Sequence, residues 1–173
     1  MASIEERLTG GHPNSLGNTV AVVEDVLDRP QMFEELFNCY FSKDEVVRLR
    51  VSSAIKRIAK AKREIVIPYL DRLQTEIALI DQASTQWTLA QLFHILENDL
   101  TSAQMERAKE IVKNNVQNHN DWIVLNESMR VLEDWSKSDS ALRTWLKPEL
   151  KRLTKDSRKS VANRANKYLK GFD

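Results

Sequence analysis

This sequence of 173 residues has little of what disulfide scaffolds, β-rich folds and membrane proteins require. It holds one cysteine, Cys39, which excludes an intramolecular disulfide and a metal site built from several thiolates. Only 4 glycines and 4 prolines interrupt the chain, and its apolar residues recur with the period of a helix. No apolar run reaches the ~18 residues of a membrane span, and the N-terminus lacks a basic segment followed by an apolar core. We predict an all-α protein in the cytoplasm, with no membrane span or secretory signal.

Charge of one sign is also lacking, because 26 Lys and Arg oppose 25 Asp and Glu and the formal net charge is +1. This balance argues against a globally basic nucleic-acid binder. The basic residues nevertheless gather in two blocks, with 8 against 2 acids in residues 43–63 and 11 against 4 in residues 137–173. A solvated helical face and a phosphate-binding surface both remain open as interpretations. The candidates for phosphate contacts in the second block are Lys159, Arg164, Lys167 and Lys170.

The clearest predicted helix spans residues 42–61. Ser42 and Glu45 have the spacing of a capping box, which predicts that the helix starts at Ser42. Apolar residues then follow at spacings of three and four and form one stripe, namely Val47, Val51, Ala54, Ile55 and Ile58. Most basic residues lie off this stripe, which predicts a basic outer face formed by Arg50, Lys56, Arg57 and Lys60.

The same periodicity predicts a series of further helices joined by short loops. Residues 1–13 have little apolar content and are interrupted at Gly10–Pro13, so we interpret them as an N-terminal lead-in and a candidate mobile segment. Residues 14–173 are predicted to form a single domain in which successive helices are antiparallel neighbours. The other predicted helices are 15–28, 30–41, 63–80, 85–96, 101–116, 121–135, 138–154 and 157–170.

A period of about 38 residues relates alternate helices. Ile55, Phe93, Leu132 and Leu169 are separated by 38, 39 and 37 residues. A closed bundle has no reason to keep such a period, whereas stacked helix pairs do. The positions four and eight residues earlier in each copy complete the register: Val51, Leu89, Ser128 and Ala165, then Val47, Thr85, Val124 and Val161.

The segment 30–61 resembles a HEAT repeat, in which a helix often containing proline is followed by an Asp-started turn and a second helix. Asp44, Val47, Arg48 and Ile55 match that pattern, while Val51 stands where the family usually has a small residue. The resemblance extends over about residues 15–170 and weakens in the later copies. It implies an all-α, right-handed α-solenoid of stacked antiparallel helix pairs, an armadillo-type superhelix whose second helices line the concave face.

We predict a non-enzymatic scaffold that binds a protein or peptide segment on this concave face, because a polar surface of mixed charge with one aromatic residue suits such a partner. Tryptophan and arginine are the residue types most often found as binding hot spots. A merely solvated surface is the alternative interpretation. The predicted partner-binding residues are Trp87, Gln91, His94, Asn126 and Arg130.

An alternative function is nucleic-acid binding, including a relationship to the HEAT-like glycosylases that repair alkylated DNA. Such enzymes place aromatic residues on the concave face, and this chain has four tryptophans, Trp87, Trp122, Trp135 and Trp145. Trp135 and Trp145 fall on apolar stripes and are predicted to be core. No motif assigns a catalytic residue or a cofactor, and the three histidines lack metal-ligand spacing. The oligomeric state is not indicated by the sequence.

Overall fold

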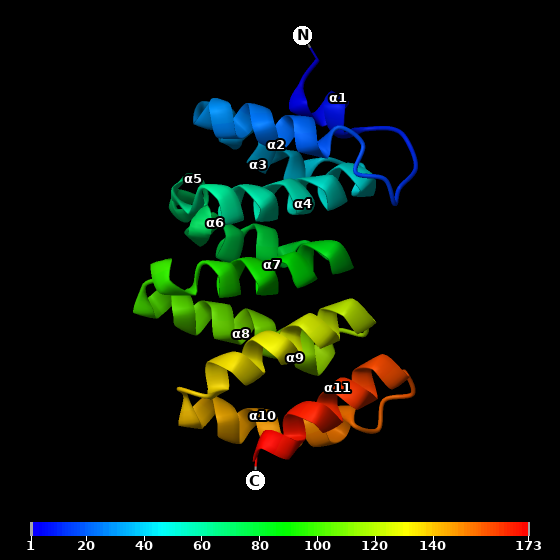
Figure 1. Ribbon diagram of the computed structural model, residues 1–173, viewed down its shortest axis with the longest axis vertical. Helices are drawn as coiled ribbons and strands as arrows, with labels where there is room; N and C mark the ends of the chain where they lie inside the picture. Colours follow the sequence, from blue (N-terminus) through cyan, green and yellow to red (C-terminus); the bar gives the residue numbers. More distant parts are fainter. Residues whose placement is uncertain (1, 173) are drawn as a thin grey trace. The chain divides into compact units, whose positions relative to one another are not determined.

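The computed structural model describes residues 2–172, and every regular element among them is helical, with no strand (Figure 1). This confirms the all-α prediction. The chain forms two compact units, residues 1–101 and residues 102–173, which we describe separately. The prediction of one repeat domain over residues 14–173 stays a prediction. Within residues 2–172, no helix is both long enough and apolar enough to cross a membrane.

In the N-terminal unit, α2 packs against α4 and α4 packs against α7 (Figure 1). Shorter helical segments connect these three helices. The elements of this unit are α1 (Ile4–Leu8), α2 (Thr19–Asp28), η1 (Pro30–Met32), α3 (Phe33–Asn38), η2 (Cys39–Phe41), α4 (Glu45–Ala61), α5 (Arg63–Val66), η3 (Ile67–Tyr69), α6 (Leu70–Thr75), η4 (Ile77–Leu79), α7 (Ala83–Ile95) and η5 (Glu97–Asp99).

Proline breaks the helix that the sequence predicts over residues 63–80. Its ring removes an N–H donor and crowds the preceding turn, so a regular α-helix does not continue through it. Pro68 accordingly lies in the 3-10 turn η3, which separates α5 from α6. Pro30 acts similarly at the start of η1, ahead of α3.

The start of α4 differs from the prediction. The N-cap is Asp44, whose carboxylate accepts a hydrogen bond from the backbone N–H of Val46 at 2.8 Å. Ser42 Oγ instead accepts from the N–H of Asp44 at 3.1 Å. The predicted capping box between Ser42 and Glu45 is therefore wrong. An aspartate is as good an N-cap as a serine, and it also places negative charge at the positive end of the helix dipole.

The N-terminal lead-in contributes to the core of its unit. Ser3 and Glu6 form a capping box at the start of α1. Ile4 and Leu8 are buried, and the N–H of Ile4 donates to the Glu35 carboxylate at 2.8 Å.

In the C-terminal unit, α9 packs against α8, α10 and α11, and α10 also packs against α11. Aspartate N-caps begin two of these helices. Asp121 accepts from the backbone at the start of α9, and Asp139 accepts from the Leu142 N–H at the start of α10. The elements of this unit are α8 (Ser102–Asn118), α9 (Trp122–Ser136), α10 (Ser140–Leu153), α11 (Lys159–Leu169) and η6 (Lys170–Phe172).

The predicted register marks the core of both units. Eleven of its twelve residues have no exposed surface, and only Leu169 is half-buried. Two of the buried register residues are polar, Thr85 and Ser128, and their hydroxyl oxygens have no hydrogen-bond partner. The apolar period therefore identifies which face of each of these helices is buried, even where the residue is not apolar.

Candidate functional site

In the N-terminal unit, α4 and α7 bring two predicted site residues, Trp87 and Gln91, onto one surface with side chains of α4. Leu49, Ser53 and Lys56 of α4 lie beside Trp87 of α7. One helical turn beyond Trp87, Lys56 Nζ donates a hydrogen bond to Gln91 Oε1 at 3.1 Å and so links α4 to α7. We call these five residues the Trp87 surface.

A cavity of about 350 Å³ opens beside Trp87. Its walls come from α4, from α7 and from the loop residues 13–16, which include the exposed side chain of Leu16. The charged side chains that line it are Arg50 and Lys56, and no carboxylate is among the lining residues. The cavity therefore combines an aromatic wall with positive charge.

Arg50 holds the loop that forms one wall of this cavity. Its side chain is only 1% exposed, and its guanidinium donates to backbone carbonyl oxygens rather than to a carboxylate. The prediction of a basic outer face is wrong for this residue, because Arg50 lies at the edge of the apolar stripe, three residues after Val47. The four accepting carbonyls are those of Leu8 at 2.8 Å, Gly10 at 2.6 Å, His12 at 3.1 Å and Ser15 at 3.2 Å.

Gly17 allows the loop to pass close to this guanidinium. Its φ is +54°, in the left-handed region that favours glycine. A Cβ at this position would come within 3.0 Å of Arg50 Cζ. The loop conformation thus depends on a glycine and on a buried arginine that are far apart in sequence.

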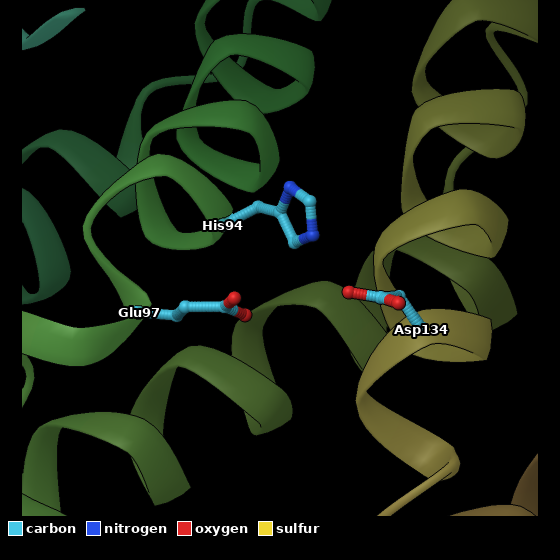
Figure 2. Close-up of side chains that lie close together, drawn as sticks. All are labelled: His94, Glu97 and Asp134. Carbon is cyan, nitrogen blue, oxygen red and sulfur yellow. The ribbon is translucent and has the colours of Figure 1, made fainter.

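His94 and Glu97 lie at the far end of α7 from Trp87. Figure 2 shows both side chains, with Glu97 in the turn η5 that follows α7; Asp134, in the same view, belongs to α9 of the C-terminal unit. Among the described residues of the N-terminal unit, no third His, Cys, Asp or Glu joins His94 and Glu97 in a cluster. A structural zinc site needs four protein ligands and a catalytic one needs three, so this pair alone is not a metal centre.

The other two predicted partner-binding residues lie in the C-terminal unit, on α9. Asn126 is only 6% exposed, and its Oδ1 atom is buried without a hydrogen-bond partner. Arg130 is half-buried and pairs with Glu127 of the same helix at 2.8 Å. Asn126 therefore offers little surface to a partner, and the guanidinium of Arg130 already has a counter-charge.

The predicted phosphate-contacting residues gather on α11 and its C-terminal turn. Lys159, Lys167 and Lys170 are exposed, and Arg164 is half-buried. Val161 and Ala165 form the buried face of α11. At 100° per residue, Lys159 and Lys167 point about 140° away from that face and Arg164 flanks it. We call these four residues the α11 cationic face.

The remaining candidates for chemistry are mostly buried or already in contact with other groups. Cys39 is buried, its Sγ donates to the Glu35 carbonyl at 3.2 Å, and burial raises the pKa of the thiol to about 12, so it is a poor nucleophile. Trp135 is buried, as predicted, whereas Trp145 is half-buried beneath the Lys113 ammonium, 4.8 Å from its ring centre. Trp122 is the exposed tryptophan, at 49%.

Comparison with family models, with curated proteins and with solved structures gave no match for this chain. The HEAT-repeat resemblance therefore stays a prediction.

Proposed function

We propose that the protein is a non-enzymatic binding module whose N-terminal unit takes up an acidic protein segment at the Trp87 surface. The observation that carries this proposal is the cavity beside Trp87, which has an aromatic wall and only positive charges in its lining. Its volume of about 350 Å³ lies at the lower end of the range for pockets that bind small ligands. One large apolar side chain of a partner fits such a space.

The aromatic ring and the positive charges of the cavity lining favour a partner segment that carries both an apolar and an acidic side chain. An apolar side chain that enters the cavity gains about 1.5–3 kcal/mol from burial, with Trp87 as the hot-spot residue. An acidic residue next to it in the partner accepts a hydrogen bond from Lys56, whose Nζ already donates to Gln91. A basic segment is disfavoured, because no carboxylate in the lining would pair with it.

The arrangement we propose for this surface is that of HEAT-like helix pairs in a right-handed α-solenoid. Two observations support it within the N-terminal unit. The helices α4 and α7, which carry two successive predicted copies of the register, pack against each other, and their register residues are all buried. In such a stack, α4 and α7 are the second helices of their pairs. Their sides that do not pack against other helices line the concave face.

The test is a peptide-display screen on the full chain, followed by binding measurements with synthetic peptides. We expect the selected peptides to pair an aromatic or aliphatic residue with Asp or Glu. Trp87→Ala should weaken their binding at least about tenfold, as removal of a hot spot does. Trp122→Ala is the matched control, because it removes an exposed tryptophan from the other unit, and it should leave peptide binding unchanged.

A charge-reversal pair tests the second element of the proposal. Lys56→Glu should weaken binding of the acidic peptides, whereas Lys60→Glu, on an exposed position of the same helix, should not. Selection of basic peptides, or equal binding by the Trp87→Ala and wild-type proteins, would overturn the proposal.

A further inference from the structure

The C-terminal helices carry cations that the protein itself does not neutralise. Residues 140–172 contain 10 Lys and Arg but only two acids, Glu149 and Asp156. Both carboxylates are already paired, Glu149 with Arg152 at 3.0 Å and Asp156 with Arg158 at 2.9 Å. No carboxylate within residues 2–172 pairs with any of seven others, namely Lys147, Lys151, Lys155, Lys159, Arg164, Lys167 and Lys170.

The α11 cationic face places Lys159 and Lys167 in a row on the outer side of α11, continued by Lys170 in the following turn, with Arg164 at the edge of this row. Lys159 and Lys167 are eight residues apart, which is about 12 Å along the helix. That length equals the rise of about three or four nucleotides of one strand along a duplex. The row is thus long enough to contact several phosphates in succession, and a solvated face without a ligand has no counter-charge to offset its self-repulsion.

Nucleic acid fits this surface better than an anionic membrane does. Helices that lie on membranes place large apolar side chains beside their basic ones. Among residues 2–172, no large apolar side chain of α10 or α11 is exposed. The exposed aromatic ring of the unit is Trp122 at the start of α9, and the Arg158 guanidinium donates to the carbonyl of Asn120, two residues before it. The beginning of α11 therefore lies beside the loop that leads into an exposed ring, on which an unpaired base can stack.

We infer that the C-terminal unit binds nucleic acid through its phosphate backbone, with the α11 cationic face as the main contact and little preference for base sequence. This activity is independent of the peptide-binding function proposed for the N-terminal unit. Base-specific contacts play no part in it.

The test measures binding of the full chain to a fluorescent single-stranded oligonucleotide and to the corresponding duplex by anisotropy, at about 50 mM and about 200 mM salt. We expect binding that weakens steeply as salt rises. The variant Lys159→Glu/Arg164→Glu/Lys167→Glu should bind at least about tenfold more weakly, and the slope of log K against log salt should become shallower by about 2–3. Trp122→Ala should weaken binding of the single strand more than that of the duplex.

The matched control is Lys43→Glu/Arg57→Glu/Lys60→Glu, which makes the same change in net charge at exposed positions of the N-terminal unit. It should retain nucleic-acid affinity within about threefold, because its cations lie outside the binding row. Circular dichroism and thermal melting check that both triple variants are folded, and Lys159→Gln/Lys167→Gln replaces the first if reversal unfolds it. Absence of oligonucleotide binding at low salt, or an equal loss of affinity in the control, would overturn the inference.

Discussion

The two units of the chain both bury the residues of the predicted register, but they differ in how their charges are distributed. Residues 1–101 contain 15 acids and 11 Lys and Arg, whereas residues 102–173 contain 10 acids and 15 Lys and Arg. The N-terminal unit buries one of its cations, Arg50, against backbone carbonyls. The C-terminal unit leaves most of the cations of α10 and α11 at the surface.

The two units therefore have equivalent buried positions but different surface residues. Ile55 and Leu132 occupy equivalent register positions in the two units, and both are fully buried. The surfaces of the two units nevertheless differ: α4, the helix of Ile55, lines an aromatic cavity in one unit, and α11 carries a cationic face in the other. The residues of the predicted register are packed in the core of each unit, and the residues off the apolar stripe determine the chemistry of its surface.

The largest expected effect tests whether the register positions are equivalent in energy. Ile55→Ala and Leu132→Ala should each lower the free energy of unfolding by about 2–5 kcal/mol, because each leaves a cavity in a packed core. Urea denaturation followed by circular dichroism measures both. A loss below about 1 kcal/mol in either variant would break the equivalence of the two units.

Among the described residues of the C-terminal unit, no arginine or lysine is buried as Arg50 is. Replacing Arg50 therefore tests a feature of the N-terminal unit alone. Arg50→Met should cost about 2–4 kcal/mol, because it removes a buried charge-assisted network and leaves the carbonyls of the loop without their donor. Arg57→Met, on an exposed position of the same helix, should change stability by less than about 0.5 kcal/mol. Equal effects in the two variants, measured by urea denaturation, would show that the loop is not held by Arg50.

A smaller effect of opposite sign is expected where a hydroxyl is buried without a partner in each unit. Thr85→Val and Ser128→Ala should each raise the free energy of unfolding by about 1 kcal/mol, since an unsatisfied polar group is removed from the core. Ser52→Ala is the control, because the Ser52 hydroxyl is bonded to the buried Tyr40 hydroxyl at 2.8 Å and its loss should be destabilising. Destabilisation in all three variants would show that the two hydroxyls are satisfied in solution.

The smallest effect concerns acid stability of the C-terminal unit. The hydrogen bond from Lys109 to Asp139, at 2.8 Å, and that from the Leu142 N–H hold the pKa of this carboxyl below its usual value. The ionised carboxylate therefore stabilises the folded state above the unfolded pKa of about 3.9, and this contribution is lost as pH falls through the lower folded pKa.

Asp139→Asn keeps an N-cap residue but removes the charge. It should cost less than about 1 kcal/mol at pH 7, because the ion pair is partly exposed to solvent. Urea denaturation of the wild type and the variant at several pH values measures the difference, which should disappear in strong acid. A difference that does not change with pH would assign the effect to the cap rather than to the charge.

Much of the helical arrangement was predictable, but the details that depend on contacts distant in sequence were not. The predicted helices over residues 85–96, 121–135 and 157–170 correspond to α7, α9 and α11 within two residues at each end. The start of α4 was missed because Ser42 and Asp44 both suit an N-cap, and local sequence does not choose between them. The break at Pro68 was missed in the helix predicted over residues 63–80, because a proline can kink a helix as well as end it.

The candidate site was predictable in part. Helical spacing puts Trp87 and Gln91 on the side of their helix away from the apolar stripe, and in the structure they lie beside residues of α4. Asn126 was placed by the same rule but is buried, because a helix position opposite one stripe can still be covered by other parts of the fold. The cavity itself was missed, since it needs the loop at residues 13–16, which carries no periodic signal.

The helical class, the period and the buried face of the register helices were predictable because they depend only on residue spacing along one chain. Eleven buried register residues, including the polar Thr85 and Ser128, follow from that period. Only the tertiary structure decided that Arg50 leaves the basic surface to bind the carbonyls of the N-terminal loop, and that the cations of α11 remain outside. Burying a cation is costly unless hydrogen-bond acceptors compensate it, and the acceptors of Arg50 are backbone oxygens far away in sequence, which spacing along the chain does not reveal.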